Sequence, residues 1–276
     1  MNIRKIKLLI ICVLVSGVAY ANHSMAHSGP IKNAKYINGE ITKTFKDGRT
    51  GIISWKTRYI TAKGMAPSSP NTYNPAQAEV SARTAAIVDA QRYLLEMTQG
   101  VQVDVTTCVS DYMVSEVKRK HIKGIIKDYE ITEESWEGGK YEITMQIPMG
   151  KLIKIFVNDD DNINDNVAPN RQTNYTGLVI DARSIDLKPA IRISIYSERG
   201  EKICGPTHTT YRVTGKGIED IRDKRLGNNP FRIYANGTSD SNNVDIVISD
   251  EDANRIRNNI LYTEVFSKGR FFVLID

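Results

Sequence analysis

Histidine and cysteine are scarce in this chain, which has four histidines and three cysteines among 276 residues. It contains no Gly-x-Ser-x-Gly elbow, no His-Glu-x-x-His helix and no phosphate loop ending in Gly-Lys-Ser/Thr, which excludes three common catalytic motifs. His121 and His208 are the plausible general bases, and neither has an acidic or nucleophilic partner at a telling spacing. The sequence therefore predicts a protein that is not an enzyme and has no cofactor.

Two of the cysteines, Cys108 and Cys204, lie downstream of an apolar segment that contains Cys12. In an exported protein this pair can form a disulfide, and the alternative is two separate thiols that pack as small apolar side chains. Their spacing excludes a zinc knuckle. His23 and His27 are four residues apart, but a metal site needs a third or fourth ligand, so we expect solvated histidines and no metal.

The first 21 residues have the pattern of a secretory signal peptide. Three basic residues precede the apolar stretch 8–18, and the small-x-small sequence that follows predicts cleavage after Ala21. The residues before Cys12 lack the small residue of a lipoprotein cleavage box, and no later segment is apolar over the length of a membrane span. We expect an exported, non-lipidated protein of the periplasm or the outer-membrane periphery.

A large excess of charge is also lacking. The signal segment holds three of the 37 basic residues and none of the 32 acidic ones, so the mature chain has a net charge of about +2. This balance provides no basic surface for nucleic acid, which we exclude as a partner.

The main feature of the first half is a predicted helix at 74–100. Asn74 is suited to the N-cap, Pro75 to the first helical position, and Gly100 to the end of the helix. Small and apolar residues recur at spacings of three and four, which predicts a stripe that a sheet can approach closely. The stripe consists of Ala78, Ala82, Ala86, Ala90, Tyr93, Leu94 and Met97.

Strands are predicted on both sides of this helix. The patterns predict strands at 51–64 and 101–109, a short helix at 111–120, and a hairpin of 122–134 and 140–148 with a Gly-Gly turn. We expect a mobile arm or an edge strand at 22–50, an α+β domain at 51–157 and an acidic linker at 158–174. The linker does not fit a calcium-binding EF-hand loop, because Asp165 falls where glycine is needed.

Several runs between residues 51 and 150 resemble the LPP20 lipoprotein family, which is itself similar to the N-terminal domains of the flagellar assembly T and flagellar P proteins. In order, the runs are 53–55, 60–64, 74–78, 85–90, 92–96 and 100–103. The resemblance implies a periplasmic or outer-membrane-associated protein without known catalysis and, in flagellated members, an assembly or ring component of the motor. The lipobox cysteine of the lipidated members is absent.

Residues 175–276 predict a second α+β unit. The patterns predict strands at 178–180, 190–196, 201–204, 230–235, 244–248 and 271–275, a short helix at 217–226 and a last helix capped by Ser249. We expect each unit to be a small, mainly antiparallel sheet packed with helices. The runs 177–183 and 187–190 resemble a C-terminal module, of no known activity, that often follows the LPP20-like domain in exported bacterial proteins.

One polar cluster in the second unit is a candidate ligand site. Asp181 and Arg183 come at the end of a predicted strand, where ligands often bind in open α/β sheets. Together with Asp186 they can form a polar site, and the alternative is local pairing around a turn. Gly215 and Gly217 flank a lysine and can form an anion nest, or simply a tight turn.

From these patterns and the resemblance we expect a non-enzymatic exported envelope protein, a structural or assembly factor with a flagellar or outer-membrane association. Its partners would be other envelope proteins or further copies of itself. The alternative is a periplasmic small-ligand-binding or enzymatic domain with its site near Asp181 and Arg183.

Overall fold

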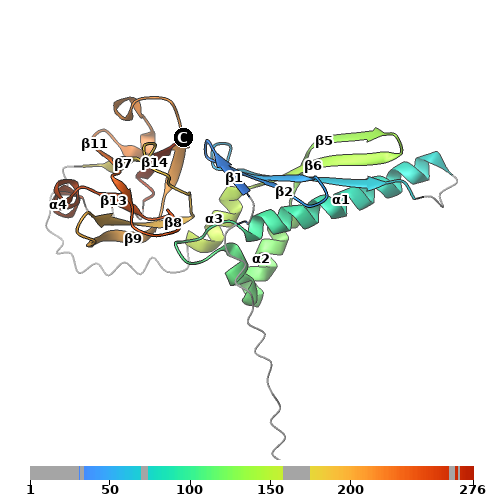
Figure 1. Ribbon diagram of the computed structural model, residues 1–276, viewed down its shortest axis with the longest axis horizontal. Coiled ribbons are helices and arrows are strands. Elements are labelled where there is room, and N and C mark those ends of the chain that lie inside the picture. Colours follow the sequence, from blue (N-terminus) through green and yellow to red (C-terminus); the bar gives the residue numbers. More distant parts are fainter. Residues whose placement is uncertain (1–30, 32–33, 70–73, 158–174, 261–264, 267) are drawn as a thin grey trace, which may run out of the picture.

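The computed structural model describes residue 31 and residues 34–69, 74–157, 175–260, 265–266 and 268–276. We call residues 34–157 the first unit and residues 175–276 the second unit. Both contain helices and sheets, so the prediction of a two-domain α+β protein is confirmed. The two units lie end to end (Figure 1). The predicted signal peptide and the predicted linker at 158–174 fall outside the described residues.

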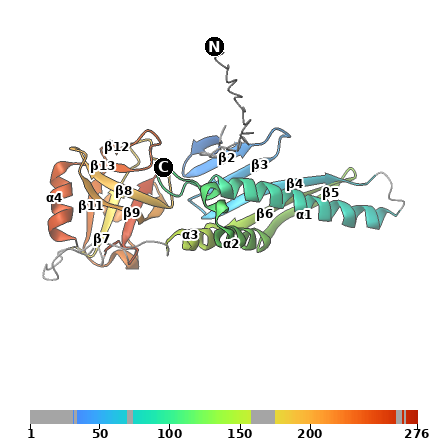
Figure 2. The same ribbon diagram turned by 90° about the horizontal axis from the view of Figure 1, so that it is seen from below.

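The described part of the first unit is built on a six-stranded antiparallel sheet with the order β1-β2-β3-β4-β6-β5. The strands are β1 (Ala34–Ile37), β2 (Glu40–Thr44), β3 (Thr50–Ser54), β4 (Tyr59–Pro67), β5 (Glu130–Glu137) and β6 (Lys140–Pro148). Every second side chain of β6 is buried, from Tyr141 to Ile147, which marks the face that the helices cover. Figure 2 shows the helices of this unit on one side of the sheet.

Helix α1 (Pro75–Gln99) covers most of that face, and the prediction for this segment is confirmed. The Asn74 side chain accepts the Ala76 N–H at 3.0 Å as an N-cap, and the whole predicted stripe is buried. At Gly64 of β4 the helix approaches the strand so closely that an added Cβ would lie 2.3 Å from both Ala86 O and Ala90 N. The alanine stripe therefore packs on bare backbone at this point.

The N-terminal boundary of the sheet corrects two expectations. Residues 34–50 are not a separate arm but contribute β1 and β2, with β1 at the edge of the sheet. The predicted strand at 51–64 is two strands, because the chain turns at residues 55–58. Ser54 Oγ accepts the Thr57 N–H at 3.1 Å in this turn, and Arg58 has a left-handed φ of 64°. No glycine or proline marks the turn in the sequence.

The segment between α1 and β5 also differs from its prediction. Residues 101–109 form a loop with one isolated bridge, Gln102 to Cys108, and the 3₁₀ helix η1 (Val109–Val114) follows. Helix α2 (Glu116–Lys127) then includes residues 122–127, which we had expected in a strand, because Ile122, Ile125 and Ile126 bury one helical face. The β5–β6 hairpin turns at Gly138 and Gly139, both at positive φ, as predicted. Helix α3 (Met149–Val157) ends the unit.

The second unit contains two four-stranded sheets. Their strands are β10 (Thr210–Val213), β14 (Phe271–Ile275), β7 (Gly177–Asp181) and β11 (Pro230–Tyr234) in the first, and β12 (Gly237–Thr238), β13 (Ile246–Ile248), β8 (Arg192–Ser197) and β9 (Lys202–His208) in the second. The first sheet is wholly parallel, so the expectation of a mainly antiparallel sheet is wrong here. Every residue of β7 and β14 is buried, as is typical of parallel strands.

The remaining elements of this unit are short. The β8–β9 hairpin is confirmed, whereas the helix predicted at 217–226 is two 3₁₀ turns, η2 (Ile218–Asp220) and η3 (Lys224–Leu226). Helix α4 (Asp250–Asn259) begins as predicted at Ser249, whose Oγ accepts the Asp252 N–H at 3.1 Å. None of the helices in the described ranges combines the length and apolar character that crossing a bilayer requires.

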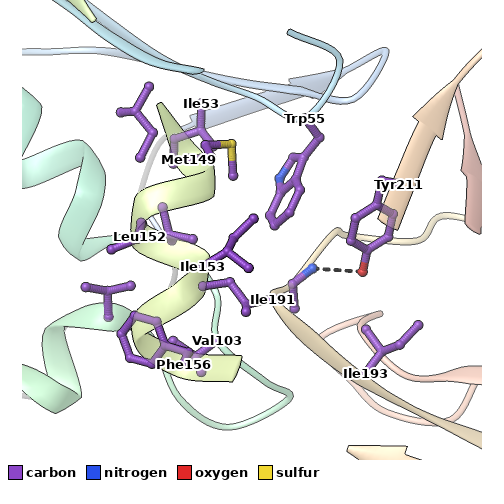
Figure 3. Close-up of a cluster of buried hydrophobic side chains, with 14 of the residues drawn as sticks. Ile53, Trp55, Val103, Met149, Leu152, Ile153, Phe156, Ile191, Ile193 and Tyr211 are labelled. Atoms are coloured by element: carbon purple, nitrogen blue, oxygen red, sulfur yellow. Dashed lines mark hydrogen bonds between the residues drawn. The ribbon is translucent and has the colours of Figure 1, made fainter. Parts of the chain in front are cut away.

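The two units share one continuous hydrophobic core. The N–H groups of Ile191 and Arg192 donate to Gln102 O at 3.0 Å and to Val103 O at 2.8 Å. Figure 3 shows Trp55 of the first unit facing Tyr211 of the second, with 5.0 Å between their ring centroids. We call this set of contacts the junction.

We predict that Gly64→Val destabilises the protein by at least about 3 kcal/mol, because the new side chain meets backbone atoms of α1 that cannot move aside. Urea unfolding followed by circular dichroism measures the change. Gly124→Ala in α2 is the matched control, since a Cβ there meets no neighbour. It should stabilise the protein by about 1 kcal/mol. Equal midpoints for the two variants would contradict the close packing.

Candidate functional site

The structure places Asp181 at the end of β7 and brings Arg183 and the 214–216 loop to it. Arg183 Nε donates to Asp181 Oδ1 at 2.9 Å, and Nη2 donates to Oδ2 at 2.5 Å. Arg183 Nη1 donates to Thr214 O at 3.0 Å and to Lys216 O at 2.8 Å. The predicted proximity of Asp181, Arg183 and the Gly215 loop is therefore present.

The Asp181–Arg183 pair is closed on itself. The Asp181 side chain is 7% exposed, and Arg183 is 21% exposed. Burial alone would raise the pKa of Asp181, but hydrogen bonds and the charge of Arg183 outweigh it and lower that pKa. Both carboxylate oxygens and all three guanidinium nitrogens have partners within the chain. The arrangement holds the 214–216 loop against β7, and a ligand would have to displace one of these bonds.

The other predicted members of this site lie apart or have a local role. Asp186 is exposed and accepts a hydrogen bond from Asn243 Nδ2 at 2.8 Å. Gly217 precedes η2, a helix of three residues, which presents too few N–H groups to form an anion site. Gly215 lies in open space. The tight-turn alternative describes this loop.

The two cysteines are free and buried, so the disulfide is not formed. Cys108 Sγ contacts Gln102 Oε1 at 3.3 Å, and Cys204 lies in β9. Burial raises the pKa of the Cys108 thiol to about 11 and raises that of Cys204 further. Both thiols are therefore protonated at neutral pH and unsuited to nucleophilic attack.

Metal ligands and histidines do not gather in the described ranges. No group of three or more His, Cys, Asp or Glu side chains there could hold a metal ion. His121 is exposed on α2, His208 ends β9, and the His23–His27 pair lies outside the described residues.

Two hollows were not predicted from the sequence. A cavity of about 230 Å³ lies between the units and is lined by residues such as Tyr36, Gly100, Gln102 and Pro189. A more open cavity of about 650 Å³ lies on the second unit, beside η3 and β11, and Arg222, Lys224 and Arg232 line it. Residues of each hollow come from distant parts of the chain, so no local motif marks them.

A family of known domains matches the second unit. Residues 177–276 fit the family described as Treponema pallidum Tp0624, second domain. The match spans both sheets of the second unit and supports the sequence-based view that it is a C-terminal module found in other proteins. No curated protein matches the chain.

We predict that Asp181→Asn destabilises the protein by about 2 kcal/mol, because Arg183 keeps its charge in a mostly buried position without a carboxylate. The folded pKa of Asp181 lies below its unfolded value of about 3.9, so the pair contributes fully above that pH. Its contribution falls as the pH drops through the folded pKa, and wild type and variant converge in acid.

Urea unfolding at pH 7 and at pH 3 checks this prediction. Asp186→Asn is the matched control, because it removes an exposed carboxylate and should change stability by less than about 0.5 kcal/mol. If the Asp181 and Asp186 variants behave alike, the Asp181–Arg183 pair does not fasten the loop.

Proposed function

We propose that this chain is a non-enzymatic exported envelope protein, which serves as a rigid structural or assembly component through contacts with other proteins. The resemblance of residues 51–150 to the LPP20 family and to flagellar N-terminal domains supports an envelope setting. The match of residues 177–276 supports the same modular organisation, since that family is the second domain of a larger protein.

The observation that carries the proposal is the junction. Units connected by a small polar interface move relative to one another, whereas a large apolar interface fixes them. Here the main chain of 191–192 bonds to the 102–103 loop, and Asn242 Nδ2 donates to Val105 O at 2.7 Å. Proteins that close on a ligand need a hinge between units, and a building block needs a fixed geometry. The junction suits the second requirement.

The outward surface of α1 is the contact face that we favour. Val80 is 65% exposed and Val88 is 61% exposed, and both lie on the side of α1 that faces away from the buried alanine stripe. Exposed apolar side chains on a long helix are suited to packing against another protein. The β5 edge is a poorer candidate, since Glu130, Glu133 and Glu137 place negative charge along it and hinder strand pairing.

A double variant, Val80→Glu with Val88→Glu, should leave the stability within about 1 kcal/mol of wild type, because both residues are exposed. It should abolish the crosslinks that a photoreactive residue at Ala85, exposed on the same helix, forms in the bacterial periplasm. It should also fail to restore motility or envelope integrity in a deletion strain, as read by swimming and by detergent sensitivity.

The matched control is Val114→Glu with Val117→Glu, two valines of similar exposure near the start of α2. This variant should keep both the crosslinks from position 85 and the restoration of the deletion strain. A normal phenotype in the deletion strain, together with no crosslinked protein, would contradict the assembly role.

A further inference from the structure

Two arginines of the second unit share one carboxylate. Arg212 on β10 and Arg225 on η3 stack on the Phe272 ring, with their Cζ atoms 5.2 Å and 4.6 Å from its centroid. Arg212 Nη2 bonds to Asp223 Oδ2 at 2.5 Å, and Arg225 binds both oxygens at 3.1 Å. The arginine hydrogen bonds, Arg225 first, lower the pKa of Asp223 well below its usual range. The carboxylate is therefore ionised and fully engaged.

A third arginine approaches this pair from the first unit. Arg58 lies in the turn between β3 and β4, next to the junction, and is held there with a left-handed φ of 64°. Within the described residues its guanidinium is partly buried and has no hydrogen-bond or ion-pair partner. Burial, followed by the charges of Arg225 and Arg212, lowers the pKa of Arg58. An unpaired, partly buried cation beside two others is unfavourable unless an anion neutralises it.

The charge of this cluster defines what would neutralise it. Three guanidiniums and one carboxylate leave an excess of two positive charges. The 650 Å³ cavity opens at Asp223 and continues along Arg222, Lys224 and Arg232, so the surroundings are also cationic. Asp223 occupies Nη2 of Arg212 and Nε with Nη2 of Arg225. The Nη1 atoms of both arginines and the whole Arg58 guanidinium remain available within the described structure.

We propose that Arg58, Arg212 and Arg225 form a binding site for a dianionic phosphoryl group. A phosphoryl group carries close to two negative charges at neutral pH and accepts paired N–H donors from guanidinium groups. The site takes its residues from both units, so an occupied site links them beside the junction. Its ligand is a phosphomonoester, either soluble or displayed on a lipid headgroup.

Thermal unfolding of the mature chain in low-salt buffer, with inorganic phosphate titrated in, tests the site. The wild-type Tm should rise by about 5 °C at a hundredfold excess over the dissociation constant. Arg58→Gln should weaken phosphate binding at least about tenfold. Without phosphate this variant should be at least as stable as wild type, because it removes an uncompensated charge.

Arg199→Gln is the control, since it removes the same charge from a distant exposed turn where Arg199 pairs with Asp250 at 2.9 Å. It should respond to phosphate as the wild type does. If wild type, Arg58→Gln and Arg199→Gln all respond equally, or if none responds, the proposed site is overturned.

Two further arms distinguish the source of the phosphoryl group. Glycerol phosphate, titrated calorimetrically, represents a soluble ligand, and vesicles of phosphatidylcholine with phosphatidic acid represent a lipid headgroup. Arg58-dependent binding in the first arm assigns a soluble phosphomonoester, and Arg58-dependent cosedimentation in the second arm alone assigns a lipid. Binding that does not depend on Arg58 in either arm overturns the proposal.

Discussion

The structure depends on how residues 101–103 meet the start of β8. The Tyr211 hydroxyl accepts the Ala190 N–H at 3.1 Å and so fixes the residue just before the two that bond to the loop. Tyr211 is itself held by the edge of Trp55 from the turn between β3 and β4. Buried main-chain groups must find partners, and here each unit supplies the partners of the other. The junction therefore sets the positions of the 55–58 turn, the 101–109 loop and the edge of the parallel sheet together.

Features with a strong local pattern could be predicted from the sequence. Helix α1 has a cap, a stripe and an end within one segment, and the β5–β6 hairpin has its Gly-Gly turn. The 55–58 turn has no such residues, since the Ser54 hydroxyl and a left-handed Arg58 form it, so one strand was predicted where two exist. The parallel sheet escaped prediction because strand direction depends on the path of the chain, which short apolar runs do not record.

The candidate site divides in the same way. Asp181 and Arg183 are two residues apart, so their proximity followed from the sequence. The carbonyls of the 214–216 loop, which occupy the remaining donors of Arg183, come from a distant segment, and they turn a potential site into a fastening. The three clustered arginines have no sequence signal, because the fold alone brings Arg58 to Arg212 and Arg225.

The two buried thiols have a kinetic consequence. In an oxidising compartment an unfolded chain with Cys108 and Cys204 exposed can be crosslinked wrongly, so burial of both sulfurs must outpace oxidation. Once folded, each unit carries one protected thiol, which reacts with a labelling reagent only when its surroundings open. The labelling rates at the two positions thus report separately on how often each unit opens, and equal rates would mean that the shared core makes the two units open as one cooperative body.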